Sequence, residues 1–248
     1  MTDKKVALIT GGARGIGRRL VEDFVSSGYA VAFCYNNSED RAKELQNRLV
    51  DNGYDVVTCK ADISNEWEVA KLVDTVMAEY GRIDVLVNNS ATTNDSLFRD
   101  KDSESFNRVL NTNLVGTFNV SKLVGQIMCE NKCGKIINIS STNGIDTYYP
   151  MCLEYDASKA GVNSLTHNLA MQFAPYVNVN AIAPGFIATE SEIKDMDEEF
   201  IRQEEEKILL KRAGTEEDIS NLVMFLASDK ASYINNQIIK INGGMYGD

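Results

Sequence analysis

The sequence has little histidine and little proline, and its apolar residues never form a long run. Among 248 residues there are one histidine, three prolines and five cysteines. The cysteines, at Cys34, Cys59, Cys129, Cys133 and Cys152, lack the paired spacing of a zinc site, so we expect free thiols and no bound metal. No apolar run approaches the roughly 20 residues that cross a bilayer. We therefore expect a cytoplasmic protein that does not span a membrane.

Basic residues are scarce relative to acidic ones. The chain has 25 Lys and Arg against 36 Asp and Glu, which gives a formal net charge of −11. Nucleic acids and anionic membranes select basic surfaces, so this balance argues against both as main partners. It also disfavours, less strongly, an acidic protein partner.

Short apolar runs alternate with longer segments of helical pattern. The nearly continuous apolar character of residues 6–9 and 85–87 is typical of strands that are covered on both faces, as in a parallel sheet. Since no linker or repeat divides the chain, we expect one doubly wound α/β domain over residues 1–248, a Rossmann-type fold with a mostly parallel seven-stranded sheet and helices on both faces. The expected strands are 5–10, 30–35, 55–59, 83–88, 135–140, 177–182 and 237–241, and the expected helices are 15–27, 39–52, 66–80, 103–128, 155–173, 198–210 and 216–227.

A glycine-rich segment, residues 10–17, follows the first expected strand and opens a helix. Glycines at Gly11, Gly12, Gly15 and Gly17 let the backbone turn tightly and approach a pyrophosphate, while the helix N-terminus supplies free amides. The alternative is a tight turn that binds no ligand. Its place after the first strand of a βαβ unit favours a dinucleotide site.

Tyr155 and Lys159 are four residues apart at the start of an expected helix. Side chains at this spacing lie one above the other on one helix face, and a nearby ammonium favours the ionised form of a phenol. The pair could therefore transfer a proton near neutral pH. A Tyr and a Lys four residues apart are common in helices, so the spacing alone does not indicate a catalytic pair. Other segments of the chain must support that reading.

Together these segments resemble the short-chain dehydrogenase/reductase family over nearly the whole chain. The spacing Gly-x-x-x-Gly-x-Gly is the family's form of the turn, and residues 88–91 resemble its Asn-Asn-Ala-Gly motif with the last two positions altered. Asn113 matches a helix asparagine, Ser141 a serine after the fifth strand, and Pro184-Gly185 with Thr189 an element beside the nicotinamide. Bacterial β-ketoacyl-acyl-carrier-protein reductases have the most similar general pattern.

This resemblance implies a catalytic tetrad of Asn113, Ser141, Tyr155 and Lys159. Tyr155 would donate a proton to a substrate carbonyl as hydride arrives, or remove one from an alcohol. Lys159 would favour the phenolate and hold the ribose of the coenzyme, and Ser141 would bind the substrate oxygen. Asn113 would position a water that links Lys159 to solvent.

The resemblance also indicates where the coenzyme lies, and we favour NADP(H) over NAD(H). An acid after the second strand would select NAD, but the chain has uncharged Asn36 and Asn37 there, and Arg14 precedes the second glycine of the turn. The alternative is that Arg14 is a solvated turn residue. The residues expected to contact the coenzyme are Gly11, Arg14, Gly15, Ile16, Gly17, Asn36, Asn37, Asp62, Ile63, Asn89, Tyr155, Lys159, Pro184, Gly185, Ile187 and Thr189.

Two further segments depart from the family's pattern. Tyr155 follows Ser141 by fourteen positions, one more than the usual thirteen, so an extra residue lies within 145–154. This aromatic and sulfur-containing segment either bulges over the substrate pocket or packs within its own loop. The expected substrate lid is about 186–213, and its residues 186–208 are rich in acids at Glu190, Glu192, Asp195, Asp197, Glu198, Glu199, Glu204, Glu205 and Glu206, against Lys194, Arg202 and Lys207.

The acidic lid affects the expected substrate. Family members that act on an acidic carrier protein dock it through basic residues near the pocket, and here Lys132 and Lys135 are the candidates. We therefore expect a reductase or dehydrogenase of a small carbonyl or alcohol, with 3-oxoacyl-[acyl-carrier-protein] reduction as the alternative. A different class of function is an NADP-binding regulatory protein without turnover. Members of this family commonly form tetramers, so the resemblance implies a homotetramer, or a homodimer.

Overall fold

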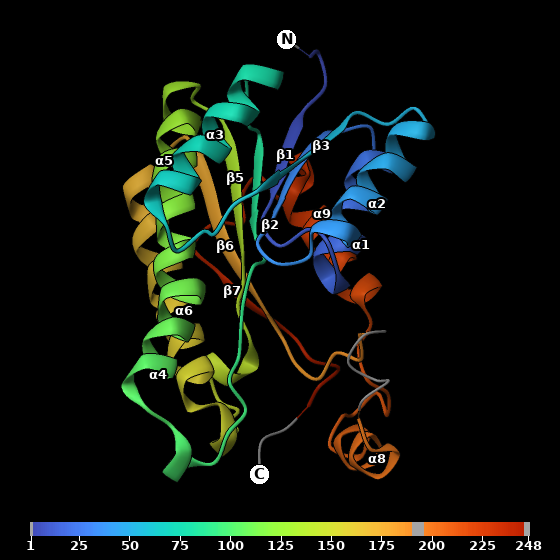
Figure 1. Ribbon diagram of the computed structural model, residues 1–248, viewed down its shortest axis with the longest axis vertical. Coiled ribbons are helices and arrows are strands. Elements are labelled where there is room, and N and C mark those ends of the chain that lie inside the picture. The colour runs from blue at the N-terminus through green and yellow to red at the C-terminus, as the bar shows by residue number, and fades with distance from the viewer. Residues whose placement is uncertain (1, 190–195, 246–248) are drawn as a thin grey trace.

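The computed structural model describes residues 2–189 and 196–245, and its strands form one twisted parallel sheet (Figure 1). The strand order is β3-β2-β1-β4-β5-β6-β7, and every pairing between neighbouring strands is parallel. The fold class expected from the sequence is therefore confirmed. The strands are β1 (Val6–Ile9), β2 (Ala30–Tyr35), β3 (Val56–Lys60), β4 (Val85–Asn88), β5 (Gly134–Ile139), β6 (Val177–Pro184) and β7 (Ile238–Ile241).

Helices cover both faces of the sheet. In Figure 1, α1, α2 and α9 lie on one side, and α3, α4, α5 and α6 lie on the other. Within the described ranges, no helix is long and apolar enough to cross a membrane. The helices are α1 (Gly15–Ser26), α2 (Glu39–Asp51), α3 (Glu66–Tyr80), α4 (Ser103–Leu110), α5 (Gly116–Glu130), α6 (Leu153–Phe173), α8 (Glu198–Glu206) and α9 (Glu216–Ala227).

The strands are buried because alternate side chains enter two separate cores. Ala7 and Ile9 of β1 pack into the core beneath α1, α2 and α9. Val6 and Leu8 pack into the core beneath α3, α5 and α6. All four are fully buried, which explains the nearly continuous apolar sequence of this strand.

The order of the strands determines where a ligand can bind. From β1 the chain proceeds outward through β2 and β3, and it then returns to the centre, where β4 pairs with the other side of β1. The connections after β1 and β4 therefore diverge at the carboxyl ends of these strands. Such a switch point leaves a crevice between the two connections.

Several element boundaries differ from expectation. The expected helix 103–128 is divided by a π-helical turn, Asn111–Val115, which lies between α4 and α5. Strand β6 continues to Pro184 because Pro184 pairs with Ile241 of β7. Helix α8 ends at Glu206, and beyond it the amide of Leu210 donates to the carbonyl of Gly243.

Candidate active site

The glycine-rich turn between β1 and α1 can be built only with glycines at its close contacts. Gly11 has a positive φ of 67°, a conformation that side chains disfavour. A Cβ on Gly17 would overlap the carbonyl oxygen of Gly11, and one on Gly12 would lie 2.6 Å from Cβ of Phe33. Helix α1 begins at Gly15 with Arg14 as its extended N-cap residue, so its first amides are directed toward the turn.

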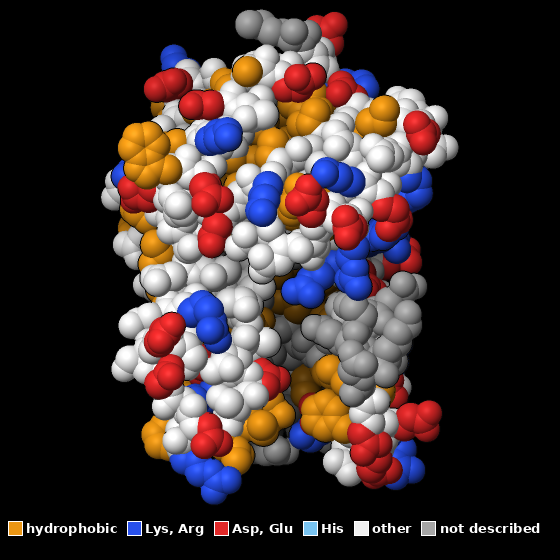
Figure 2. Space-filling model, viewed as in Figure 1, with side chains coloured by type: hydrophobic (Ala, Val, Ile, Leu, Met, Phe, Trp, Pro, Cys, Tyr) orange, Lys and Arg blue, Asp and Glu red, His pale blue; other side chains and the backbone are white. Residues whose placement is uncertain are grey.

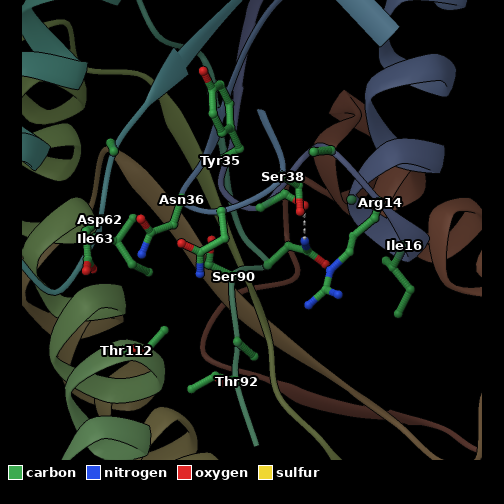
Figure 3. A pocket seen from close by; sticks show the side chains of 18 of the residues that line it. Arg14, Ile16, Tyr35, Asn36, Ser38, Asp62, Ile63, Ser90, Thr92 and Thr112 are labelled. Atoms are coloured by element: carbon green, nitrogen blue, oxygen red, sulfur yellow. Dashed lines mark hydrogen bonds between the residues drawn. The ribbon is translucent and has the colours of Figure 1, made fainter. Parts of the chain in front are cut away.

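A cleft of about 580 Å³ opens above this turn. Figure 3 shows Arg14 and Ile16 on one side of it and Asn36 and Asp62 on the opposite side. Of the expected coenzyme contacts, those that line the cleft are Gly11, Arg14, Gly15, Ile16, Gly17, Asn36, Asn37, Asp62, Ile63, Asn89 and Thr189.

The remaining expected contacts lie beyond this lining. Tyr155 and Lys159 are on α6, Pro184 ends β6, and Gly185 and Ile187 follow it. The segment after β6 folds back toward the turn: a Cβ on Gly15 would lie 3.8 Å from Cγ2 of Thr189. Residues 190–195 of the expected lid, with Glu190, Glu192, Lys194 and Asp195, are outside the described ranges.

Asn89 binds the ends of β1 and β4 together beneath the cleft. Its Nδ2 donates to the carbonyl oxygens of Thr10 (3.0 Å) and Gly11 (3.1 Å). In return, Oγ1 of Thr10 accepts from the amides of Asn89 and Ser90, both at 3.0 Å. The glycine-rich turn is therefore held in position by β4, not by contacts within the turn alone.

Lys159 is buried at the inner end of the site. Its Nζ donates to the carbonyl of Ile139 at 2.7 Å and lies 5.4 Å from the ring centroid of Tyr155. Burial lowers the pKa of Lys159 to about 8, because the charged ammonium loses hydration. The sequence-based expectation that the two side chains are neighbours is met, with the ammonium over the ring.

Ser141 follows β5 and begins a short 3-10 turn, Thr142–Gly144, that lies against α6. Its Oγ accepts from the amide of Asn143 at 3.2 Å, and Nδ2 of Asn143 donates to Asp156 of α6 at 2.7 Å. A Cβ on Gly144 would lie only 2.5 Å from the carbonyl carbon of Lys159. Glycine at this position lets the serine turn approach the helix that carries Tyr155 and Lys159.

Asn113 lies in the π-helical turn, with its side chain buried and fully engaged by protein groups. Its Oδ1 accepts from the amide of Thr92 at 2.8 Å, and its Nδ2 donates to the carbonyl of Thr92 and to Oγ of Ser158. The Ser158 hydroxyl in turn donates to the carbonyl of Tyr155 at 2.7 Å. Asn113 thereby joins the segment that follows β4 to the first turns of α6.

Sequence reasoning missed part of the lining. Arg108 reaches the cleft from α4 and Thr112 from the π-helical turn, and both depend on how α4 is oriented, which no local pattern reveals. Ser38, the N-cap residue of α2, ends the uncharged run that begins at Tyr35, and this run was the signal for it in the sequence. The further lining residues are Ala13, Tyr35, Ser38, Ala61, Ser90, Ala91, Thr92, Arg108 and Thr112.

The segment with the extra residue packs against the connection between β4 and α4, a partner that neither sequence-based alternative named. The amide of Ser96 donates to the carbonyl of Met151 at 3.2 Å, and Sγ of Cys152 donates to Oδ1 of Asp95 at 2.7 Å. Burial and this hydrogen bond raise the pKa of Cys152 to about 12. Tyr148, at the tip of the segment, is largely exposed.

Lys132 and Lys135 do not lie beside the cleft, which corrects their role as candidate docking residues within one chain. Lys135 is the second residue of β5 and pairs with Val85 at the start of β4. Lys132 precedes it in the connection from α5. Both therefore lie at the amino ends of the strands, across the sheet from the site at the carboxyl ends.

The doubly wound parallel sheet, the glycine turn at its switch point and the Tyr-Lys pair define an oxidoreductase class with a dinucleotide-type cleft. A family model described as enoyl-(acyl carrier protein) reductase matches residues 11–246. The chain belongs to the short-chain dehydrogenase/reductase family, which confirms the resemblance seen in the sequence.

Individual relatives match the chain over almost its full length. The 3-oxoacyl-[acyl-carrier-protein] reductase FabG of Staphylococcus epidermidis is 39% identical over 243 residues, covering 98% of this chain and 99% of the relative. The acetoacetyl-CoA reductase of an Acinetobacter species is 36% identical, with 99% of both chains covered. The solved structure of ElxO with NADP bound has a TM-score of 0.88 and 31% identity, and covers 98% of both chains.

Proposed function

We propose that this protein transfers hydride between NADP(H) and a carbonyl or secondary alcohol, with Tyr155 as the general acid/base. The observation that carries the proposal is that helix α6 brings Tyr155 and Lys159 together and is packed against the turn that begins at Ser141. The Lys159 ammonium lies over the Tyr155 ring, and the Ser141 turn packs onto the helix that bears both. This arrangement is suited to proton transfer at an oxygen atom.

The glycine turn fits a dinucleotide. The lack of side chains at Gly11 and Gly17 lets the turn pack closely on itself, on Asn89 and on Ser90, and the amides at the start of α1 would hold the pyrophosphate there. The bound coenzyme supplies or accepts the hydride. Asp62 and Ile63 would lie against its adenine, and Pro184, Gly185 and Ile187 beside its nicotinamide.

Arg14 supports NADP(H) over NAD(H). It lines the cleft together with Asn36, Asn37 and Ser38, so the wall after β2 is uncharged and the neighbouring wall is basic. A carboxylate after β2 would repel a 2′-phosphate, whereas a guanidinium binds it with charge-assisted hydrogen bonds. The NADP named for ElxO agrees with this choice.

In the direction of reduction, Tyr155 donates its phenolic proton to the substrate oxygen as negative charge develops there. The positive charge of Lys159 stabilises the phenolate that remains, and the Ser141 hydroxyl donates a hydrogen bond to the same substrate oxygen. Asn113 is joined through the Ser158 hydroxyl to the backbone carbonyl of Tyr155. In this proposal its turn would position the water that links Lys159 to solvent.

The first substrate class to test is a 3-oxoacyl thioester. The names of two relatives share this group, since one acts on 3-oxoacyl-[acyl-carrier-protein] and the other on acetoacetyl-CoA. Figure 2 shows hydrophobic side chains on both sides of the hollow between α4 and α8. Exposed Leu97 and Phe98 lie in the connection before α4, and exposed Phe200 lies on α8. The acyl chain of such a thioester would contact these hydrophobic side chains on either side of the hollow.

A second candidate is a small free ketone, and the charge of α8 favours it. In this helix, Glu199 pairs with Arg202 and Glu204 with Lys207, while Glu205 and Glu206 add further negative charge. Such a surface repels an acidic carrier. In this proposal residues 186–213 act as the substrate lid of a single domain that forms a cytoplasmic homotetramer, and light scattering would test the oligomeric state.

The test is a screen of NADPH and NADH oxidation against acetoacetyl-CoA, a neutral acetoacetyl thioester, free 3-keto esters and simple ketones. We expect NADPH-dependent reduction of at least one class. Tyr155→Phe should abolish this turnover while one NADPH still binds per chain, measured by coenzyme fluorescence. Turnover of the Tyr155→Phe variant at the wild-type rate would refute the proposed acid, and NADPH binding without turnover of any carbonyl would favour the regulatory alternative.

A further inference from the structure

A buried ion pair lies one residue from Tyr155 and is not used by the chemistry described above. Nζ of Lys101 is 2.7 Å from Oε2 and 2.9 Å from Oε1 of Glu154, and their side chains are 6% and 0% exposed. Nζ also donates to the carbonyl of Asn94 at 2.8 Å, and Nδ2 of Asn94 donates to Oε1 of Glu154 at 3.1 Å. The ammonium therefore donates two hydrogen bonds, to the carbonyl of Asn94 and to Oε1 of Glu154, while Oε2 of Glu154 is held by the charge of the ammonium without a hydrogen bond.

The pair joins two segments that border the site. Glu154 is the second residue of α6, directly before Tyr155. Lys101 lies at the end of the connection between β4 and α4, one residue before Asp102, the N-cap residue of α4. The earlier part of this connection, at Thr92, lines the cleft and is bonded to Asn113.

The connection before α4 contacts the first turn of α6 at several points, in addition to the contact that the serine turn makes with Asp156. The N-cap residue of α6 is Cys152, whose thiol donates to Asp95 of the connection and so does not cap the helix amides. The amide of Ser96 donates to Met151 across the same seam. The start of α6 is thus held by the connection before α4, and the ion pair is the charged and most deeply buried part of that seam.

The free energy needed to remove both charges from water favours a role of this ion pair in positioning over a role in stability. Removing two charges from water is expensive, and apolar residues of similar size often stabilise a core as well or better. An ion pair fixes the relative orientation of its two side chains, because its hydrogen bonds favour one geometry. Burial opposes ionisation of Glu154, but hydrogen bonds from Lys101 and Asn94 outweigh it and keep its pKa below the ordinary value.

We propose that Lys101 and Glu154 form a latch that fixes the first turn of α6 against the connection before α4, and so positions the Tyr155 phenol toward the substrate oxygen. Both are positioning residues, since they act through Tyr155. The inference rests on the proposed function. It adds that the segment with the extra residue is part of the catalytic support, because this segment ends at Glu154.

The test compares Glu154→Gln, Lys101→Met and the double variant K101M/E154M with the wild type. The amide keeps the shape of the carboxylate, and the double variant replaces the pair by apolar side chains that the core can accept. Asp229→Asn is the matched control, since Asp229 pairs with Lys5 at 3.3 Å on the exposed, opposite end of the sheet. For each variant we would measure kcat with a carbonyl substrate, the Kd for NADPH and the number of NADPH sites per chain.

A displacement of about 1 Å at a reacting group can cost on the order of a hundredfold in rate. We expect kcat to fall tenfold or more in all three variants, by similar factors because one latch is broken in each, with full NADPH sites and an unchanged Kd. A kcat within twofold of the wild type in the double variant, or a fall in proportion to lost NADPH sites, would overturn the latch. Failure of the proposed function is distinguishable, because the wild type itself would then reduce no carbonyl.

Discussion

At the scale of single residues, the proposed preference for NADP(H) over NAD(H) rests on Arg14. Its side chain extends into the cleft from the N-cap of α1, facing the uncharged run from Asn36 to Ser38 (Figure 3). Arg18, one turn further along the helix, instead forms ion pairs with Glu22 and Glu44 on the outer surface. The two arginines therefore differ in location while sharing a helix and a charge.

Arg14→Ala should weaken NADPH binding and leave NADH binding nearly unchanged. A hydrogen bond to a charged group contributes about 1.5–3 kcal/mol, so we expect the Kd for NADPH to rise roughly 10- to 100-fold. Fluorescence titration with each reduced coenzyme gives the ratio, and Arg18→Ala is the control. Equal loss of affinity for both coenzymes would show that Arg14 supports the turn and not the phosphate.

Lys159 gives a prediction about pH and stability. Its folded pKa of about 8 lies below the ordinary 10.5, so between these values the unfolded chain holds a proton that the folded chain has lost. Stability rises with pH wherever the unfolded state binds more protons, and below about pH 8 the full penalty of the buried charge remains. This contribution of Lys159 should therefore increase stability from pH 8 toward pH 10.5.

The Lys159→Met variant should lack this contribution to the pH dependence of stability. The free energy of unfolding of the wild type, relative to that of the variant, should increase by about 2 kcal/mol between about pH 7 and pH 9.5. Urea unfolding at the two pH values measures the change, and Lys122→Met, at an exposed position on α5, controls for the substitution. A difference that is constant or falls with pH would mean that Lys159 is hydrated in the folded protein.

At the scale of elements, two glycines should separate coenzyme binding from catalysis. A Cβ on Gly17 would meet the backbone of Gly11 in the coenzyme turn, and one on Gly144 would meet the backbone of Lys159 beneath the serine turn. Backbone cannot rotate away as a side chain can, so either alanine must displace its turn.

We expect Gly17→Ala to raise the Kd for NADPH at least tenfold, because the pyrophosphate site is distorted. Gly144→Ala should keep NADPH affinity within about twofold and lower kcat at least tenfold, because Ser141 moves relative to α6. Each variant is the control for the other, with coenzyme titration and steady-state rates measured on both. Loss of NADPH affinity in the Gly144→Ala variant would contradict the separation.

Elements whose ends are set by local chemistry could be predicted from the sequence. Helix α3 spans the expected residues because Asn65 caps its first turn and Gly81, at φ 77°, ends it. Helix α9 begins where expected because Thr215 and Asp218 form a capping box. The glycine turn could be recognised from its spacing after the first strand, although the contacts that require glycine at Gly11 and Gly12 come from Ser90 and Phe33.

Features that depend on distant contacts could not be predicted. The π-helical turn arises where the Asn113 side chain bonds to the backbone of Thr92, and the helical pattern of the sequence passes through it without a break. Lys101 and Glu154 are 53 positions apart, so neither marks the other in the sequence. The catalytic roles of the tetrad stay predictions, although the family and the fold are confirmed.

At the scale of the whole molecule, charge is distributed unevenly around a net value of −11. Helix α8 beside the site is strongly acidic, whereas Lys132 and Lys135 lie across the sheet. Within one chain, an acidic carrier would approach the site against repulsion, while a small neutral substrate would not sense this field. Ionic strength can therefore distinguish the two substrate classes.

Raising the ionic strength from about 0.01 M to 0.15 M shortens the Debye length from about 30 Å to 8 Å and screens this repulsion. The KM for an acetoacetyl group on an acidic carrier should then fall several-fold, whereas the KM for the same group on a neutral thiol should stay constant. Replacing Glu204, Glu205 and Glu206 of α8 with glutamine should reproduce the low carrier KM without added salt. A carrier KM that rises with salt would instead indicate attraction by basic residues near the site. The first residues to replace would then be Arg108, which lines the cleft, and Lys132 and Lys135, which a second copy of the chain could bring to it.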